Sequence, residues 1–120
     1  MIELTLSWPD KVLFPNLKVH WSTVNPTRQV QKKEAWALTL DALSEKWPYP
    51  AARIHYTFHG PDQRRRDLDS LLIAMKGATD GIATALGIDD STFAVTIEKG
   101  EARPRYGEVS VRIEPVGGEG

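Results

Sequence analysis

At 120 residues, of which 41% are hydrophobic, the chain is long enough for one domain with an ordinary core and too short for two. The absence of cysteine excludes a disulfide scaffold, a Cys₄ zinc site and a thiol nucleophile. No apolar run approaches the roughly 20 residues of a membrane span, and the first residues lack the basic-then-apolar pattern of a signal peptide. We therefore expect a soluble, cytoplasmic protein without a membrane partner.

The net charge of −1 hides an uneven distribution of acidic residues. Six of the 16 acidic residues lie within residues 62–90, namely Asp62, Asp67, Asp69, Asp80, Asp89 and Asp90. If a metal ion neutralised this cluster, 15 basic residues would stand against the ten remaining acidic ones. The whole-chain charge argues against a nucleic-acid partner, but its distribution keeps such a partner open.

The first third of the chain predicts a strand, a long loop and a helix. Residues 2–8 alternate apolar and polar side chains, which is typical of a half-buried strand. Residues 9–25 predict an irregular loop, broken by Pro9 and Pro15, of a length that is uncommon without a functional reason. Asn25 followed by Pro26 predicts a helix start, and the helix should end near Lys46. Its expected core face carries Trp36, Leu40, Leu43 and Trp47.

The rest of the chain predicts one strand, one helix and two further strands. Ile54, Tyr56 and Phe58 should face inward from the first of these strands. Asp67 is a suitable N-cap for one continuous helix that ends at Leu86, with Gly87 following it. The last two strands should be joined as a hairpin through residues 100–107, and their expected core faces carry Phe93, Val95 and Ile97, and Val109, Val111 and Ile113.

The element order is therefore β-α-β-α-β-β, which predicts an α+β single domain. We expect a four-stranded sheet with two helices on one face, formed by residues 1–116. The glycine-rich residues 117–120 are expected to be a disordered tail.

The second predicted helix carries an acidic stripe at the border of its apolar face. At about 100° per residue, Lys76 and Asp80 fall within about 20° of Asp69 and roughly 120° from the apolar stripe. One interpretation is structural: Asp67 caps the helix, Asp69 is a first-turn acid, and Asp80 pairs with Lys76. The other is chemical, because carboxylates are the ligands that Mg²⁺ and Mn²⁺ prefer. Joining Asp90 to Asp67 would then require the chain to fold back, since the helix separates them by roughly 30 Å.

Three arginines precede the first acidic pair, and the order of motifs resembles a known family. The motifs are Arg65-Arg66-Asp67-Leu68-Asp69-Ser70-Leu71, Lys76, Asp80-Gly81 and Asp89-Asp90. Together they resemble the RusA-type Holliday junction resolvases, small endonucleases mostly of bacteria and their phages. The segment Pro15-Asn16-Leu17-Lys18-Val19-His20-Trp21, which follows Trp8-Pro9, is also similar to that family. Ser70 stands where many members have Asn, and Lys76 lies about one helical turn further along than in the shorter family pattern.

The resemblance implies a homodimer that cuts two strands of a four-way junction symmetrically, with Mg²⁺ as cofactor and Mn²⁺ as an alternative. In that case Asp67, Asp69 and Asp90 would hold the metal, Lys76 would be the catalytic lysine, and Asp80 and Asp89 would be auxiliary acids. Arg64, Arg65 and Arg66 would bind flanking phosphates. The alternative is a non-catalytic protein that binds junctions or other nucleic acid with the same fold. A sugar or nucleotidyl transferase is disfavoured, because 120 residues leave no separate nucleotide-binding domain.

Three further groups of residues have both a functional and a structural interpretation. Asn16, Lys18 and His20 on the long loop are candidate DNA contacts, or a turn residue and packing partners. His55 and His59 have a spacing that can bind a metal, although surface histidines are the favoured interpretation. Glycines inside a helix are costly, so we expect a small-residue stripe to pack against the first helix or a second copy. The stripe consists of Ala74, Gly77, Ala78, Gly81 and Ala85.

Overall fold

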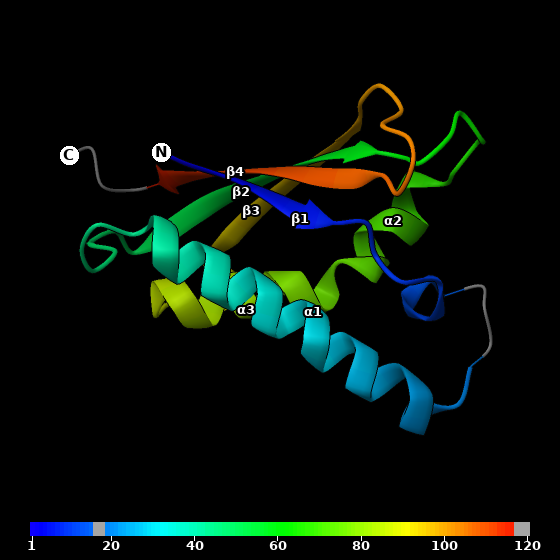
Figure 1. Cartoon of the computed structure of the whole chain (residues 1–120). Helices are drawn as coiled ribbons and strands as arrows, with labels where there is room; N and C mark the ends of the chain where they lie inside the picture. The colour runs from blue at the N-terminus through cyan, green and yellow to red at the C-terminus, as the bar shows by residue number, and fades with distance from the viewer. Residues whose placement is uncertain (16–18, 117–120) are drawn as a thin grey trace.

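A four-stranded mixed sheet forms one layer of the structure, and helices cover one of its faces (Figure 1). The computed structural model describes residues 1–15 and 19–116. The strands are β1 (Ile2–Ser7), β2 (Ala51–His59), β3 (Phe93–Lys99) and β4 (Glu108–Val116). The α-helices are α1 (Trp21–Ala42), α2 (Leu68–Ala74) and α3 (Lys76–Leu86), and short 3₁₀ helices lie at η1 (Lys11–Leu13) and η2 (Asp90–Thr92). The expected α+β class with helices against a four-stranded sheet is confirmed.

The strand order β1-β4-β2-β3 corrects the predicted hairpin. β4 lies between β1 and β2 and pairs antiparallel with both. β3 instead pairs parallel with β2 at the edge of the sheet. Residues 100–107 therefore do not join neighbouring strands, because β2 lies between β3 and β4. Alternation of side chains identified the strands, but it does not encode which strands pair.

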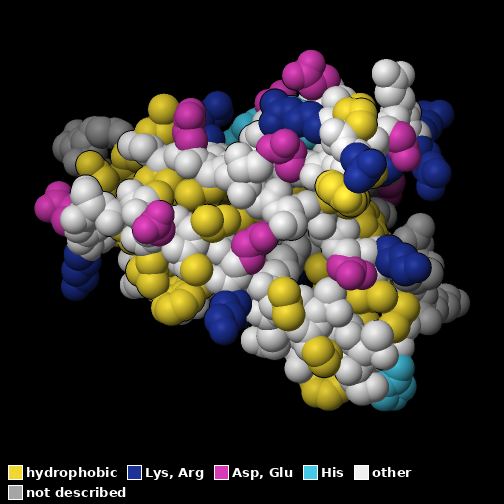
Figure 2. All heavy atoms as spheres, in the orientation of Figure 1, with side chains coloured by type: hydrophobic (Ala, Val, Ile, Leu, Met, Phe, Trp, Pro, Cys, Tyr) yellow, Lys and Arg dark blue, Asp and Glu magenta, His cyan; other side chains and the backbone are white. Residues whose placement is uncertain are grey.

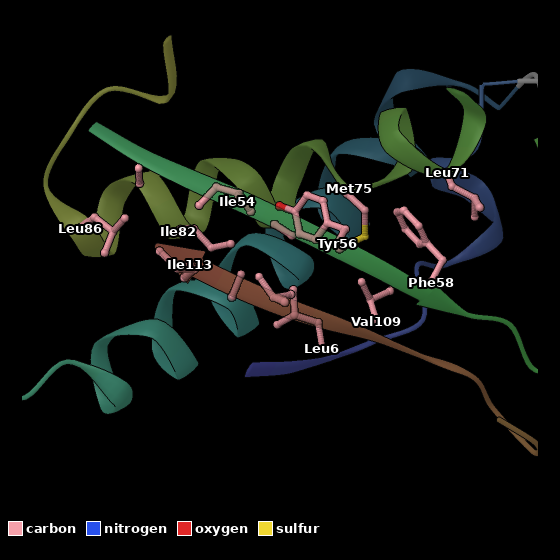
Figure 3. Close-up of a cluster of buried hydrophobic side chains, with 14 of the residues drawn as sticks. Leu6, Ile54, Tyr56, Phe58, Leu71, Met75, Ile82, Leu86, Val109 and Ile113 are labelled. Carbon is pink, nitrogen blue, oxygen red and sulfur yellow. The ribbon is translucent and has the colours of Figure 1, made fainter. Parts of the chain in front are cut away.

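The core lies between the sheet and the helices (Figure 3). The predicted inward face of β2 is confirmed, since Ile54, Tyr56 and Phe58 are almost fully buried. The same holds for the central strand β4, whose apolar residues Val109, Val111 and Ile113 are buried. The edge strand β3 is less covered, and its Val95 is 37% exposed. Leu71, Met75, Ile82 and Leu86 complete the core from the helical side.

Helix α1 begins five residues before the predicted start, at Trp21 rather than Pro26, and ends at Ala42 rather than near Lys46. Its N-cap is His20, whose Nδ1 accepts a hydrogen bond from the backbone N–H of Ser22 at 3.1 Å. Pro26 thus lies inside the helix, where its missing N–H removes one intrahelical hydrogen bond. An imidazole cap is not among the usual N-cap side chains, so the Asn-Pro pair was the stronger sequence signal.

The predicted core face of α1 is wrong for Trp36 and Leu40, whereas Leu43 does pack against the core. Ala35 and Thr39 are fully buried, whereas Trp36 and Leu40 are 38% and 41% exposed. Trp47 is buried, but it lies beyond the end of the helix. Helix α1 packs through its small residues because it approaches α3 very closely.

The close approach of α1 and α3 explains the helical glycines. A Cβ atom on Gly77 would lie 2.7 Å from the carbonyl oxygen of Arg28, and one on Gly81 would overlap the carbonyl oxygen of Lys32. The expectation that the small-residue stripe packs against the first helix is therefore confirmed.

The second predicted helix is broken at Met75, which separates α2 from α3. Met75 has φ −97° and ψ 9°, outside the helical range. Gln31 of α1 bridges the break: its Nε2 donates to the carbonyl oxygen of Ala74 at 2.9 Å, and its Oε1 accepts from the N–H of Ala78 at 3.1 Å. The break brings the number of α-helices among the described residues to three, and the face angles of a continuous helix do not hold between Asp69 and Lys76.

Among the helices of residues 1–15 and 19–116, none combines the length and the apolarity that a membrane span requires.

Candidate functional site

Asp67 occupies the N-cap position of α2 without using its side chain as a cap. Its backbone is extended, with φ −81° and ψ 125°, and its carboxylate makes no capping hydrogen bond. The carboxylate instead accepts a 3.3 Å hydrogen bond from the hydroxyl of Ser70. Asp67 thus stands at the N-cap position that the structural interpretation predicts, but its carboxylate does not cap the helix. The carboxylate is exposed and can bind a ligand.

Asp69 follows in the first turn of α2 and is exposed. Among the described residues, no hydrogen bond or ion pair engages its carboxylate. Two exposed acidic side chains therefore lie at the start of one short helix, and the Ser70 hydroxyl is the hydrogen-bond partner of one of them, Asp67.

The arginine triplet before α2 divides into one anchored side chain and two exposed ones. Arg66 is only 20% exposed, and its guanidinium donates to Asp62 Oδ1 at 2.9 Å and to the carbonyl oxygen of Arg64 at 3.0 Å. The same guanidinium lies 5.2 Å from the centre of the Trp8 ring, in a cation–π contact. The Arg64 side chain is 78% exposed and 4.0 Å from Asp62, and Arg65 is exposed. Arg64 and Arg65 can therefore reach phosphate, whereas Arg66 holds the segment in place.

Asp62 organises this segment electrostatically. The backbone N–H of Arg64 donates to its Oδ1 at 2.8 Å, and the Arg66 guanidinium adds a second bond to the same oxygen. These hydrogen bonds and the nearby arginine charges hold the pKa of Asp62 below its usual range.

A pocket of about 460 Å³ opens beside the arginines. Trp8, Phe58 and Leu71 supply apolar lining. The charged lining comes from four basic residues and two acidic ones, namely Arg64, Arg65, Arg66, Lys99, Asp62 and Glu101. Figure 2 shows basic side chains, with acidic ones among them, at the end of the molecule where Figure 1 places the loops after β2 and β3.

Lys76 begins α3, and its ammonium nitrogen lies 3.8 Å from Asp80 Oδ1. This is the i, i+4 pair of the structural interpretation. The Lys76 side chain is 60% exposed, and an exposed pair of this kind contributes little to stability. The Lys76 ammonium group can therefore leave Asp80 for an anionic group that binds it more strongly.

Asp80 in the first half of α3 and Asp89 and Asp90 after its end line one shallow pocket together with Lys32. Asp89 caps η2 by accepting a 2.8 Å hydrogen bond from the N–H of Ser91, and this bond lowers its pKa. Partial burial of the Asp90 carboxyl disfavours its charged form, and the neighbouring carboxyls of Asp80 and Asp89 act in the same direction, so the pKa of Asp90 is raised.

The structure does not bring Asp90 to Asp67 and Asp69 within one chain. Asp67 follows the end of β2, whereas Asp90 precedes β3, whose first residue Phe93 pairs with Ala52 near the start of β2. Helix α2 and the break at Met75 lie between Asp67 and Asp80, the α3 residue next to Asp90. In the part of the chain that the structure describes, no three carboxylate or histidine side chains are grouped for a metal. The expected three-carboxylate cluster therefore does not form within one chain, because parallel pairing starts β3 at the opposite end of the sheet.

The remaining candidates have structural partners or lie outside the described residues. Asn16 and Lys18 are outside them, and His20 caps α1. His55 contacts Thr96 Oγ1 at 2.6 Å and Glu98 Oε1 at 2.8 Å. His59 is not a surface residue: it is 6% exposed, donates from Nδ1 to the carbonyl oxygen of Glu101, and contacts the Ser110 hydroxyl. Both histidines thus have their ring nitrogens occupied within the protein.

Lys99 is a site residue that the sequence pattern did not reveal. It lies at the end of β3, and the parallel pairing of β2 and β3 places it beside the segment that follows β2. Phe58 pairs with Lys99 in this register. No local signal identifies Lys99, because its role depends on which strand β3 pairs with.

Comparison with known proteins yields one bacterial relative. No protein-family model matches the chain. A protein of Xylella fastidiosa (strain Temecula1), described as an uncharacterized protein, is 34% identical over 104 residues, which cover 78% of this chain. The match covers 63% of that relative, so this chain spans less than two thirds of the relative's length.

Proposed function

We propose that the protein is a metal-dependent, structure-selective endodeoxyribonuclease of the RusA type. It would act as a homodimer that resolves Holliday junctions and other branched DNA by symmetric phosphodiester hydrolysis, in recombination and repair. The observation that carries this proposal is the pair Asp67 and Asp69, two exposed carboxylates without an ion pair among the described residues, close behind the exposed Arg64 and Arg65. Free carboxylates next to phosphate-binding arginines suit a site that holds a cation against a phosphodiester.

The acidic pair fits Mg²⁺, with Mn²⁺ as an alternative. Mg²⁺ is usually held by one or two carboxylates together with water and substrate phosphate, so Asp67 and Asp69 are sufficient donors on the protein side. When bound, the ion would supply a Lewis acid that activates water and neutralises charge on the phosphate.

Two-fold symmetry offers a place for Asp90 in this site. Because Asp90 precedes β3, at the opposite end of β2 from Asp67, it would join the acidic pair from another copy of the chain. Paired cuts across a junction already require two sites related by a two-fold axis. The proposal therefore places Asp67 and Asp69 of one subunit with Asp90 of the partner subunit.

The basic residues have separate roles in this proposal. Arg64 and Arg65 bind phosphates that flank the scissile bond. Lys76 leaves its weak pair with Asp80 and places a point charge against the negative charge that develops during hydrolysis. Asp80 and Asp89 remain auxiliary acids, the first as the resting partner of Lys76 and the second as the cap of η2.

The test is cleavage of a synthetic four-way junction with and without Mg²⁺. We expect Asp69→Asn to abolish cleavage but retain junction binding, because the change removes one negative charge and keeps the size of the side chain. Asp41→Asn, an exposed position on α1, is the matched control and should cleave like the wild-type protein. A wild-type protein that is inert with both Mg²⁺ and Mn²⁺, or an Asp69→Asn variant of full activity, would refute the nuclease proposal.

A non-catalytic protein that binds branched DNA is the second candidate. It is favoured by the lack of a three-carboxylate group among the described residues of one chain and by the structural use of Asp80 and Asp89. In that case the protein should still bind junctions, but Mg²⁺ should neither change the stability of the protein nor lead to cleavage of the DNA.

A further inference from the structure

We infer that the pocket between the segment after β2 and the end of β3 binds one unpaired nucleotide of single-stranded or branched DNA. The base would occupy the apolar part of the pocket, and its phosphates would lie against Arg64, Arg65 and Lys99. This inference rests on the proposed function for the choice of DNA as ligand, and it concerns recognition rather than hydrolysis.

The pocket combines an apolar floor with a basic rim. Phe58 and Leu71 are almost completely buried, and Trp8 is half-buried with its ring edge-to-face with Phe58 at 6.2 Å. The rim is formed by the exposed side chains of Arg64, Arg65 and Lys99. A ligand that satisfies both parts must carry an aromatic or apolar group and a negative charge, which is the chemistry of a nucleotide.

Arg66 supplies a preformed stacking surface inside this pocket. Its guanidinium is held by bonds to Asp62 and to the carbonyl oxygen of Arg64, and it lies over the Trp8 ring. Planar guanidinium groups and aromatic rings are the surfaces on which proteins stack unpaired bases. Because Arg66 is already fixed, little side-chain entropy is lost when a base stacks there.

The two acidic residues that line the pocket do not neutralise the positive charge of its four basic residues. Asp62 is engaged by Arg64 and Arg66, and its lowered pKa reflects those contacts. Glu101 is exposed, while its backbone carbonyl is held by His59. The basic residues therefore outnumber the acidic ones by two at the pocket.

The size of the pocket favours a single nucleotide over a duplex. A volume of about 460 Å³ lies within the range of small-ligand sites, roughly 300–1,000 Å³. A stacked base pair cannot enter a pocket of this size without leaving the duplex, whereas a base at a branch point or in a single strand is already free to do so. The pocket would thus favour branched over linear duplex DNA before any chemistry occurs.

The experiment measures binding of a short fluorescein-labelled oligothymidylate by anisotropy in EDTA, so that cleavage cannot contribute. Ala102→Phe places a ring in the pocket without altering charge, and we expect roughly five- to hundredfold weaker binding, the effect of losing one stacked base. Arg65→Ala should weaken binding and reduce the salt slope by about 0.7. Arg105→Ala is the matched control, because Arg105 is exposed and does not line the pocket, so its slope should equal the wild-type slope.

The outcomes separate this inference from the nuclease proposal. Weaker binding by folded Ala102→Phe and Arg65→Ala, with the Arg105→Ala control unchanged, supports the pocket even if no junction is ever cut. Wild-type affinity in both pocket variants, equal losses in the Arg105→Ala control, or equal binding of a duplex of the same length would overturn the pocket even if junctions are cleaved. Thermal melting of each variant confirms that it is folded.

Discussion

Asp62 shows how one side chain sets the geometry of the arginine segment. Its carboxylate accepts from the Arg64 N–H and from the Arg66 guanidinium, and it thereby fixes Arg66 over Trp8. The Arg64 and Arg65 side chains remain exposed, while Arg66 becomes part of the pocket wall. The sequence could propose three equivalent phosphate contacts, but the individual hydrogen bonds divide them into two roles.

The pKa of Asp62 makes this arrangement sensitive to acid. Because the pKa is lowered in the folded state, the folded protein binds this proton less readily than the unfolded chain. The resulting stabilisation is fully present above the usual aspartate pKa of about 4 and is lost as pH falls through the lowered folded-state value. We therefore expect Asp62→Ala to lower the thermal midpoint at neutral pH, with a difference from the wild type that shrinks in acid. Thermal melts across this pH range, with Asp41→Ala as the control, check this; a difference independent of pH would contradict it.

At the scale of elements, the break at Met75 determines where the acidic and basic residues point. A continuous helix from Leu68 to Leu86 was the natural prediction, since residues 68–86 contain no proline. Gln31 of another helix makes the break possible by bonding Ala74 and Ala78 on either side of it. Helix propensity depends on neighbouring residues in the sequence. It therefore cannot predict a hydrogen bond between residues that are 43 positions apart.

Removing the Gln31 side chain tests this account of the break. The groups it serves belong to Ala74 and Ala78, both almost fully buried, so Gln31→Ala leaves a buried carbonyl and a buried N–H without partners. We expect the free energy of unfolding in urea to fall by about 1–3 kcal/mol. Gln29→Ala, on the exposed side of the same helix, should change it by less than about 0.5 kcal/mol. Equal effects of the two substitutions would show that Gln31 does not support the break.

For the whole molecule, the parallel pairing of β2 and β3 determines which acidic residues can belong to one metal site. It sends the chain back along α2 and α3 before β3 begins, and so separates Asp90 from Asp67 and Asp69. A catalytic group of all three acids consequently requires two copies of the chain. This requirement agrees with the symmetry that junction resolution demands.

Co-expression of two differently tagged variants tests the shared site. If the site is shared, a dimer of one Asp69→Asn chain and one Asp90→Asn chain has one site in which all three acids are intact. We therefore expect this mixed dimer to nick one strand, whereas neither variant homodimer does. A wild-type chain paired with an Asp69→Asn/Asp90→Asn double variant should be inactive, because each shared site then lacks one acid. The opposite pattern, with no rescue in the first dimer and activity in the second, would place the site within a single chain.

The sequence by itself determined the four strands, the presence of helices between them and the position of the charged motifs. Alternating apolar residues identified the four strands, and the inward faces of β2 and β4 follow from a two-residue period that is local to each strand. The cost of glycine inside a helix correctly predicted a close helix contact at Gly77 and Gly81. The residues around Asp67 and Asp69 marked the candidate site, because the order of charged residues is itself a property of the sequence.

Only the tertiary structure decided which elements meet. The face that α1 buries, the break at Met75 and the position of Lys99 beside the arginine segment all depend on contacts between residues far apart in the chain. The same is true of Asp90, which lies with Asp80 and Asp89 instead of Asp67. Local periodicity fixes which side of an element is apolar, but strand order and register arise from packing the whole chain at once, and these determine which charged groups share a site.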